Sequence, residues 1–348
     1  MSTSYTPAIP KEASFARFLG KGKIAFINKS VGSPGPGQLL LQNKANSLCG
    51  SDFAYLFNGN DTVSPGHEIA GVVAAAGPDT RIKPGTRGVV FLMDYCGKCR
   101  NCQQGATNQC LHKRADYGFT HDGGYGSYIV INENVFFPIP DSMSYAQGTL
   151  LLDIMGTGGH AIKRARLVHP SPASMIVLGA GPIGLGILAM AKIMYGKDFP
   201  VLISDVVEYR LDLAEKLGGL PINLNKGSLA EGAASQGFKE IDVAIDSSGK
   251  ESARRAALDV LSQRGVLIFV GHGEKLQLQI SPDMIATERA LLGSEYFCYN
   301  ELQGNLDLYL QNRDYLDQII THTYPIAELE EAYRVFVGRD TGKVIAEY

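Results

Sequence analysis

The pattern of apolar and polar residues changes near residue 155. Before that point, turn-forming glycine and proline clusters such as Ser33-Pro34-Gly35-Pro36-Gly37 separate short apolar runs at 37–44, 69–76, 88–92 and 128–131. Short apolar runs punctuated by turn residues are typical of β-strands. The first 155 residues are therefore predicted to form an irregular, barrel-like β region.

After residue 155, apolar strands alternate with helical segments. The predicted strands cover 175–178, 201–204, 243–246, 265–271 and 290–294. Helices are expected between them, including one that ends near Tyr195 and one over 207–217. This alternation is typical of a parallel, doubly wound sheet. We therefore expect an α/β protein with a β-rich domain at 1–155 and 300–348 and a doubly wound domain at 156–299.

Composition narrows the class of protein. The 348 residues suffice for about two domains. The chain carries 32 Lys and Arg against 35 Asp and Glu, a net charge of -3, so nucleic acid and anionic membranes are not expected partners. Glycine and proline interrupt the longest uncharged stretch, 175–191, and the N-terminal residues lack the apolar run of a secretory signal. We expect a cytoplasmic protein.

Four of the six cysteines lie within fifteen residues: Cys96, Cys99, Cys102 and Cys110. In a large chain without a secretory signal, such clustering indicates a metal site rather than disulfides. Four thiolates complete a tetrahedral zinc site and leave no position for a substrate. The cysteines are therefore predicted to hold a structural zinc that orders a lobe at about 94–113.

Two other interpretations of these cysteines remain open. The first is an iron–sulfur cluster, although the ferredoxin run ends C-x3-C-P, whereas here the last gap is seven residues and Leu111 follows. The second is a zinc-ribbon module that binds nucleic acid. Its basic face would consist of Lys98, Arg100, Lys113 and Arg114. The overall charge balance disfavours it.

A glycine-rich motif follows the predicted strand at 175–178. Its sequence is Gly179-Ala180-Gly181-Pro182-Ile183-Gly184, a G-x-G-x-x-G. The glycines permit a tight turn, close approach of a pyrophosphate and close helix packing, which indicates a dinucleotide site. Asp205, 21 residues after Gly184, is placed to accept both ribose hydroxyls, which favours NAD over NADP, and it can also cap the next helix. Arg210 instead favours NADP, because an arginine can hold a 2′-phosphate.

Further motifs recur in one order along the chain. They are CGSD at 49–52, GHE at 66–68, DGGYGSY at 122–128 and GKV at 342–344, together with the four-cysteine lobe and GAGPIG at 179–184. In this combination, nearly the whole chain resembles the zinc-dependent medium-chain dehydrogenases, the group of alcohol, polyol and threonine dehydrogenases. The resemblance implies a GroES-like β domain, a Rossmann domain, NAD and two zinc ions per chain, one catalytic and one structural.

The resemblance also assigns the catalytic zinc. Cys49 and His67 would be its ligands, and Asp153, in Leu151-Leu152-Asp153-Ile154-Met155-Gly156-Thr157-Gly158, would be the third, as in the secondary-alcohol branch. Glu68 would be a facultative fourth ligand. Ser51 matches the hydroxyl of the family's proton relay.

This chain departs from the family at one relay position, because Ala54 stands where many relatives carry histidine. The proton route beyond Ser51 is therefore expected to use water or cofactor hydroxyls. By the same resemblance, four residues at the ends of later strands would contact the nicotinamide half of the cofactor: Ser247, Ser248, Val270 and Gly271. Cys298 and His160 fit no motif, and we expect both to be structural.

The expected activity is hydride transfer between NAD(H) and a secondary alcohol or ketone, such as a polyol, a sugar or sugar phosphate, or an amino-alcohol. An open zinc site with a vacant position suits this chemistry. A homodimer or homotetramer is expected from the resemblance. Two alternatives stay open: a zinc-free reductase on the same fold, and a non-catalytic protein that senses NAD and binds nucleic acid through the cysteine lobe.

Overall fold

A computed structural model describes residues 9–348, which fold into two compact units. The first contains the chain up to Leu152 together with His322–Val337 and Lys343–Tyr348, and the second contains Asp153–Thr321 and Gly338–Gly342. We expected the chain to leave the second domain at residue 300, whereas residues 300–321 belong to the second unit. The division into a catalytic and a cofactor domain stays a prediction.

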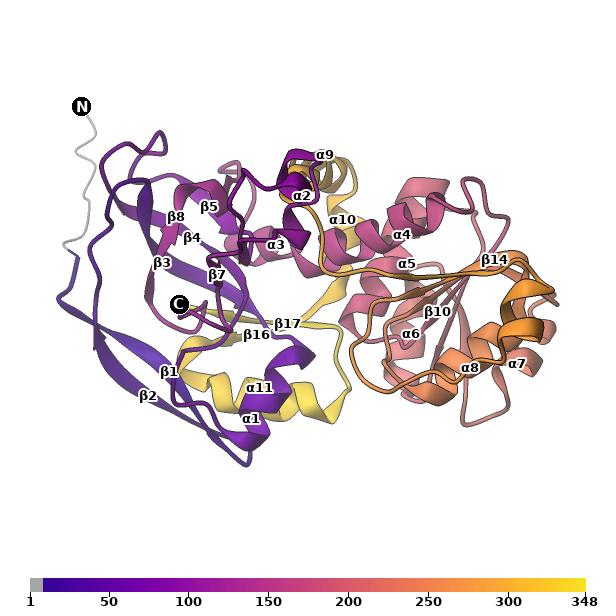
Figure 1. Cartoon of the computed structure of the whole chain (residues 1–348). Coiled ribbons are helices and arrows are strands. Elements are labelled where there is room, and N and C mark those ends of the chain that lie inside the picture. Colours follow the sequence, from indigo (N-terminus) through magenta and orange to yellow (C-terminus); the bar gives the residue numbers. More distant parts are fainter. Residues whose placement is uncertain (1–8) are drawn as a thin grey trace. The chain divides into compact units, whose positions relative to one another are not determined.

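A seven-stranded sheet organises the first unit (Figure 1). Its strands run in the order β16 (Ile320–Pro325), β17 (Lys343–Glu347), β3 (Gln38–Ser47), β4 (Glu68–Ala76), β5 (Arg87–Val90) and β9 (Phe136–Pro138), and β8 (Tyr128–Asn132) also pairs with β3. Strand β3 is central, and its Leu39, Leu40 and Leu41 are all buried. A register irregularity between Leu40 and Leu41 accompanies this departure from alternating burial. The predicted β-rich character is confirmed.

A separate antiparallel ribbon of β1 (Glu12–Gly20) and β2 (Lys23–Ser30) was not predicted. It packs with helix α11 (Leu329–Gly338), whose buried residues recur every three or four positions, as expected for an amphipathic helix. One of them, Tyr333, meets Phe18 of β1 edge to face. The short elements of this unit are α1 (Phe53–Asn58), β6 (Met93–Asp94), α2 (Arg100–Gln103), β7 (Ala115–Asp116) and α3 (Tyr145–Thr149).

The second unit contains a parallel sheet, as predicted, and it has six strands where five were expected, because β12 was not predicted. Its order is β12 (Leu220–Asn223), β11 (Val201–Asp205), β10 (Met175–Leu178), β13 (Ile241–Asp246), β14 (Leu261–Phe269) and β15 (Ala290–Gly293). The chain winds outward from β10 in one direction and then, from β13, in the other. Ligands of doubly wound sheets bind at such a switch point, beyond the carboxyl ends of the strands.

Helices complete the second unit. They are α4 (Gly158–Arg166), α5 (Pro182–Tyr195), α6 (Glu208–Lys216), α7 (Leu229–Ser235), α8 (Glu251–Val260), α9 (Leu302–Gln311) and α10 (Arg313–Leu316). Helix α5 buries eight consecutive residues, Gly184 to Ala191, and thus forms part of the core rather than a surface layer. Over residues 9–348, none of the helices combines the length and apolar character that a membrane span requires.

Candidate functional site

Four side chains predicted to bind the catalytic zinc converge. Donor atoms of Cys49, His67, Glu68 and Asp153 all lie within 4.8 Å of one another. Antiparallel pairing explains part of this, because Ser47 at the end of β3 faces Glu68 at the start of β4. Cys49 therefore emerges beside His67, although 18 residues separate them in the chain.

Asp153 reaches this cluster through helix α3. The hydroxyl of Ser47 donates to that of Thr149 over 2.6 Å, which fixes the end of α3 beside β3. Asp153 follows four residues later and begins a π-helical turn, Asp153–Thr157. Its side chain is buried, so it is not a surface acid.

The donor set matches the chemistry of zinc. A thiol, an imidazole and a carboxylate are the ligands of catalytic zinc sites, and buried carboxylates require a compensating cation. Glu68 already has one, since its Oε1 is ion-paired with Lys343 Nζ and both side chains are buried. The remaining Cys49, His67 and Asp153 fit a divalent ion. Whether Glu68 ever joins them stays a prediction.

A buried polar network stands behind His67. Asp52 Oδ1 lies 3.8 Å from His67 Nδ1, and the Tyr333 hydroxyl donates to Asp52 Oδ2 over 2.7 Å. The hydroxyls of Tyr333 and Tyr125 are 2.9 Å apart. Burial raises the pKa of both tyrosines well above the usual value, so both remain protonated. The network fixes the Asp52 carboxylate where it faces the imidazole.

The roles of Asp52, Tyr125 and Tyr333 in this network were not predicted. Asp52 belongs to the CGSD motif and Tyr125 to DGGYGSY, so the motifs held a signal. Tyr333 lies 281 residues from Asp52 and carried none.

The predicted proton-relay residue lies close to the cluster in sequence. Ser51 sits in the 3-10 turn Gly50–Asp52, immediately after Cys49, and its side chain is exposed. Ala54 follows in α1 and is also exposed. The Phe119 ring packs 4.9 Å from the His67 ring and so shields the imidazole. The relay role of Ser51 stays a prediction.

The second cysteine cluster also forms as predicted. The sulfurs of Cys96, Cys99, Cys102 and Cys110 all lie within 4.8 Å of one another. Backbone N–H groups of Cys102 and Leu111 lower the pKa of Cys99 to about 6, while burial raises the pKa of Cys102 to about 12. Backbone donors thus stabilise individual thiolates here, while the close approach of the four sulfurs opposes the ionisation of all of them. A bound cation would offset this repulsion between thiolates, so the lobe fits zinc.

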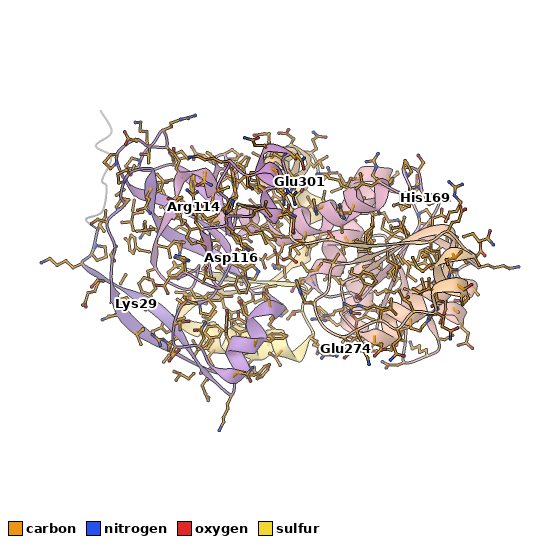
Figure 2. The ribbon with its side chains drawn as sticks, viewed as in Figure 1. Lys29, Arg114, Asp116, His169, Glu274 and Glu301 are labelled. Atoms are coloured by element: carbon orange, nitrogen blue, oxygen red, sulfur yellow. The ribbon has the colours of Figure 1, made fainter. Side chains whose placement is uncertain are left out.

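Salt bridges tie two of the four basic residues of the lobe to carboxylates of the same unit. Arg114 Nη2 lies 2.6 Å from Oδ1 of buried Asp94, and Lys113 Nζ lies 2.7 Å from Asp116 Oδ2. Arg114 and Asp116 are labelled in Figure 2. Internal pairing reduces the positive charge that these residues could offer a phosphate backbone. The nucleic-acid interpretation of the lobe is correspondingly weakened.

The glycine-rich loop of the second unit has the geometry of a dinucleotide site. Gly179 has a φ of +90°, and a Cβ on Gly184 would overlap the Gly179 carbonyl, so both positions require glycine. Gly181 caps helix α5, and Pro182 occupies its first turn beside Ile183. The free N–H groups at this helix start are suited to bind a pyrophosphate.

Asp205 is held at the carboxyl end of β11. Its Oδ2 accepts a hydrogen bond of 2.7 Å from Ala180 N–H, and its Oδ1 accepts from Val206 and Val207 N–H at 2.7 and 3.0 Å. It therefore ties the glycine loop to the turn before α6. Arg210 lies near the same loop. Its Nη1 atom is 3.6 Å from the position that a Cβ would occupy at Gly181. Burial lowers the pKa of Arg210, while Asp205 raises it.

The residues predicted to meet the nicotinamide lie at the ends of β13 and β14. Ser247 Oγ donates to the carbonyl oxygens of Leu178 and Gly179, which couples β13 to the glycine loop. Ser248 Oγ donates to Asp246 Oδ1 over 2.7 Å. The N–H groups of Val270 and Gly271 both donate to the Asp246 carbonyl. These contacts bring the predicted residues together, and their role toward the cofactor stays a prediction.

A buried ion pair that was not predicted supports this end of the sheet. Arg254 Nε lies 2.7 Å from Asp246 Oδ2, and Arg254 Nη2 donates to the Gly271 carbonyl over 2.6 Å. The sequence did hold one sign of this ion pair, because Asp246 is an acid at the end of the apolar strand Ile241–Asp246.

Known proteins that are similar to this chain carry the same two kinds of domain. The "Alcohol dehydrogenase GroES-like domain" model matches residues 35–141, and the "Glucose dehydrogenase C-terminus" model matches residues 158–347. The zinc-type alcohol dehydrogenase-like protein YphC of Escherichia coli (strain K12) is 27% identical, over 94% of this chain and 97% of that protein. The L-threonine 3-dehydrogenase of Shewanella baltica (strain OS155) is 29% identical, over 90% and 93%.

Solved structures share the fold. The alcohol dehydrogenase rspB of E. coli CFT073, crystallised with NADH, superposes with a TM-score of 0.87 at 22% identity and covers 97% of this chain and 100% of its own. At the level of the family, the comparisons confirm the predicted fold class and the predicted alcohol oxidoreductase activity. They also confirm the predicted nicotinamide and zinc cofactors. The chain belongs to the medium-chain dehydrogenase family.

Proposed function

We propose that the protein interconverts a secondary alcohol and its ketone, with NAD(H) as hydride carrier and a zinc ion held by Cys49, His67 and Asp153. The observation that carries the proposal is the convergence of these donors, with Glu68, within 4.8 Å. A purely structural role would not need mixed donors that leave a coordination position open.

Charge balance supports three ligands rather than four. The charges of the Cys49 thiolate and the Asp153 carboxylate together offset those of one Zn²⁺. Lys343 offsets the charge of Glu68 in their buried ion pair. A neutral site is favourable in buried surroundings, where uncompensated charge is costly.

Each protein group then has a stated task. When bound, zinc acts as a Lewis acid that lowers the pKa of an alcohol or polarises a carbonyl. Asp52 faces His67 Nδ1, which leaves Nε2 for the metal. Ser51 is proposed to accept the alcohol proton, and its exposure in the turn after Cys49 allows water to carry the proton onward in place of the histidine missing at Ala54.

The cofactor proposal rests on the glycine loop and Asp205. The start of α5 offers N–H groups to the pyrophosphate, and the fixed Asp205 carboxylate suits two ribose hydroxyls but repels a 2′-phosphate. NAD is therefore proposed over NADP, with Arg210 beside the phosphates. Ser247, Ser248, Val270 and Gly271 are proposed to position the nicotinamide.

The proposed substrate is a small polar secondary alcohol: a polyol, a sugar or sugar phosphate, or an amino-alcohol. The names of the relatives, an alcohol dehydrogenase-like protein and a threonine dehydrogenase, support this class. We further propose that the protein works in the cytoplasm as a homodimer or homotetramer. Strand β15 ends the six-strand order and carries three half-buried apolar residues, Ala290 to Leu292, which suits pairing with a second copy. Size-exclusion chromatography with light scattering measures the molar mass of the particle and so tests the proposed oligomeric state.

One experiment tests the activity. NADH formation is followed for polyols, L-threonine, sugar phosphates and simple secondary alcohols, with the zinc content measured in parallel. The expected result is turnover of at least one of these, lost in Cys49→Ser and Asp153→Asn but kept in the control Asp198→Asn, which alters an exposed acid outside the sites. Full turnover in Cys49→Ser would instead select the zinc-free reductase.

A further inference from the structure

A third group of metal-binding side chains lies in the second unit, apart from both predicted zinc sites. Donor atoms of His160, Cys298 and Glu301 lie within 4.8 Å of one another. His160 Nδ1 is 2.9 Å from Glu301 Oε2, and both of these side chains are 13% exposed. None of the three belongs to the zinc-type family motifs, so this group has no part in the proposed function.

Local structure explains the convergence. Cys298 caps the 3-10 turn Tyr299–Glu301, which leads into α9, and Glu301 is the third residue of that turn. The Glu301 Oε2 atom accepts a 2.9 Å hydrogen bond from the Cys298 N–H, so the thiol and carboxylate are held on one turn. His160 comes from α4, a separate helix of the same unit.

A neighbouring lysine orients the carboxylate. Lys163, one turn after His160 on α4, places Nζ 2.7 Å from Glu301 Oε1, which leaves Oε2 directed at His160. The ion pair with Lys163 thus fixes the orientation of the Glu301 carboxylate, with Oε2 facing the His160 ring and the Cys298 turn.

We propose that His160, Cys298 and Glu301 form a third metal site, which binds a borderline-soft divalent cation, Zn²⁺, with its fourth position open to water. Thiolate, imidazole and carboxylate are the donors that zinc prefers. Bonds of about 2.0–2.3 Å place tetrahedral ligands roughly 3.3–3.8 Å apart, so the side chains need to adjust only slightly. A bound ion would join α4 to the start of α9 and stabilise this unit.

The test measures zinc per chain on the full-length protein after equilibrium dialysis against Zn²⁺. Three zinc ions are expected in the wild type and two in Cys298→Ser and His160→Ala. His169→Ala, which removes another partly buried histidine of the same unit, is the matched control and should keep three. Glu301→Gln, which preserves side-chain shape, serves if the other variants fail to fold.

The melting temperature provides a second readout. In protein whose four-cysteine lobe is already loaded with zinc, added Zn²⁺ should raise the melting temperature of Cys49→Ser, which lacks the proposed catalytic ligand. It should not raise the melting temperature of Cys49→Ser combined with His160→Ala. Since neither readout needs turnover, failure of this proposal is distinguishable from failure of the proposed activity. Two zinc ions in the wild type, or three in Cys298→Ser and His160→Ala, would overturn the proposal and leave an ion-pair cluster only.

Discussion

The two predicted zinc clusters of this chain are built in opposite ways. The lobe cluster draws four cysteines from fifteen consecutive residues, and three of them are only half-buried. The Cys49 cluster draws a thiol, an imidazole and two carboxylates from three distant segments, and only Cys49 is less than fully buried. A local, all-sulfur set can saturate a metal and order a loop, whereas a mixed set assembled by the fold can keep a position open for chemistry.

The largest expected effect separates the clusters by activity. Asp153→Asn keeps the side-chain volume but removes the charge that helps to hold the catalytic zinc. We expect turnover to fall to background while the circular dichroism spectrum stays that of the wild type. Substantial turnover with stoichiometric zinc would place the third ligand elsewhere.

The next effect separates the clusters by stability. Cys102→Ser breaks the closed set of the lobe, and we expect a stability loss of ~3 kcal/mol, which corresponds to a fall in melting temperature of about 6–12 °C for a domain of this size. Turnover per folded molecule should stay within about twofold of the wild type. A melting temperature equal to that of the wild type would show that the lobe needs no metal.

A smaller effect is expected from the network behind His67. Tyr333→Phe removes the hydroxyl that donates to Asp52 and so loosens the carboxylate that faces the imidazole. Groups that orient metal ligands contribute about 10–100-fold to affinity, and we expect the lower end, because Tyr333 acts through Asp52. Competition with a chelator measures the zinc affinity. Tyr324→Phe in β16 of the same unit is the control, and equal affinities in the two variants would count against the network.

The smallest effect concerns the support of the lobe. Arg114→Ala leaves the buried Asp94 with its hydrogen bond from Asn132 but without its salt bridge. Because the Arg114 side chain is about half exposed, we expect a loss of only ~1 kcal/mol in the free energy of unfolding. Denaturant titration measures it. A change as large as that of Cys102→Ser would make the salt bridge, rather than the metal, the main support of the lobe.

The same contrast explains what could be predicted from the sequence. The four cysteines and the glycine loop are local patterns whose residues meet through a turn or a strand–helix junction, so their spacing sufficed. The parallel sheet followed from the alternation of strands and helices. Cys49, His67 and Asp153 are not local, and only the resemblance to a family brought them together.

What sequence analysis missed depends on long-range packing. Tyr333 reaches Asp52 because α11 packs against the ribbon of β1 and β2. The amphipathic pattern of α11 indicates a buried face but not the element against which that face packs. The second compact unit extends to Thr321, beyond the boundary expected near residue 300, because the short helices after β15 resemble the irregular pieces of the first unit. His160 meets Cys298 and Glu301 only because α4 lies beside the start of α9. Cys298 and His160 were therefore expected to be structural, and Glu301 was not singled out.

The most direct test is an anomalous difference map collected at the zinc absorption edge from crystals of the active protein with NAD. We expect a peak about 2.0–2.3 Å from Cys49 Sγ, a His67 ring nitrogen and an Asp153 carboxylate oxygen, in addition to the peak in the four-cysteine lobe. Crystals of fully active protein with a peak only in the lobe would contradict this expectation.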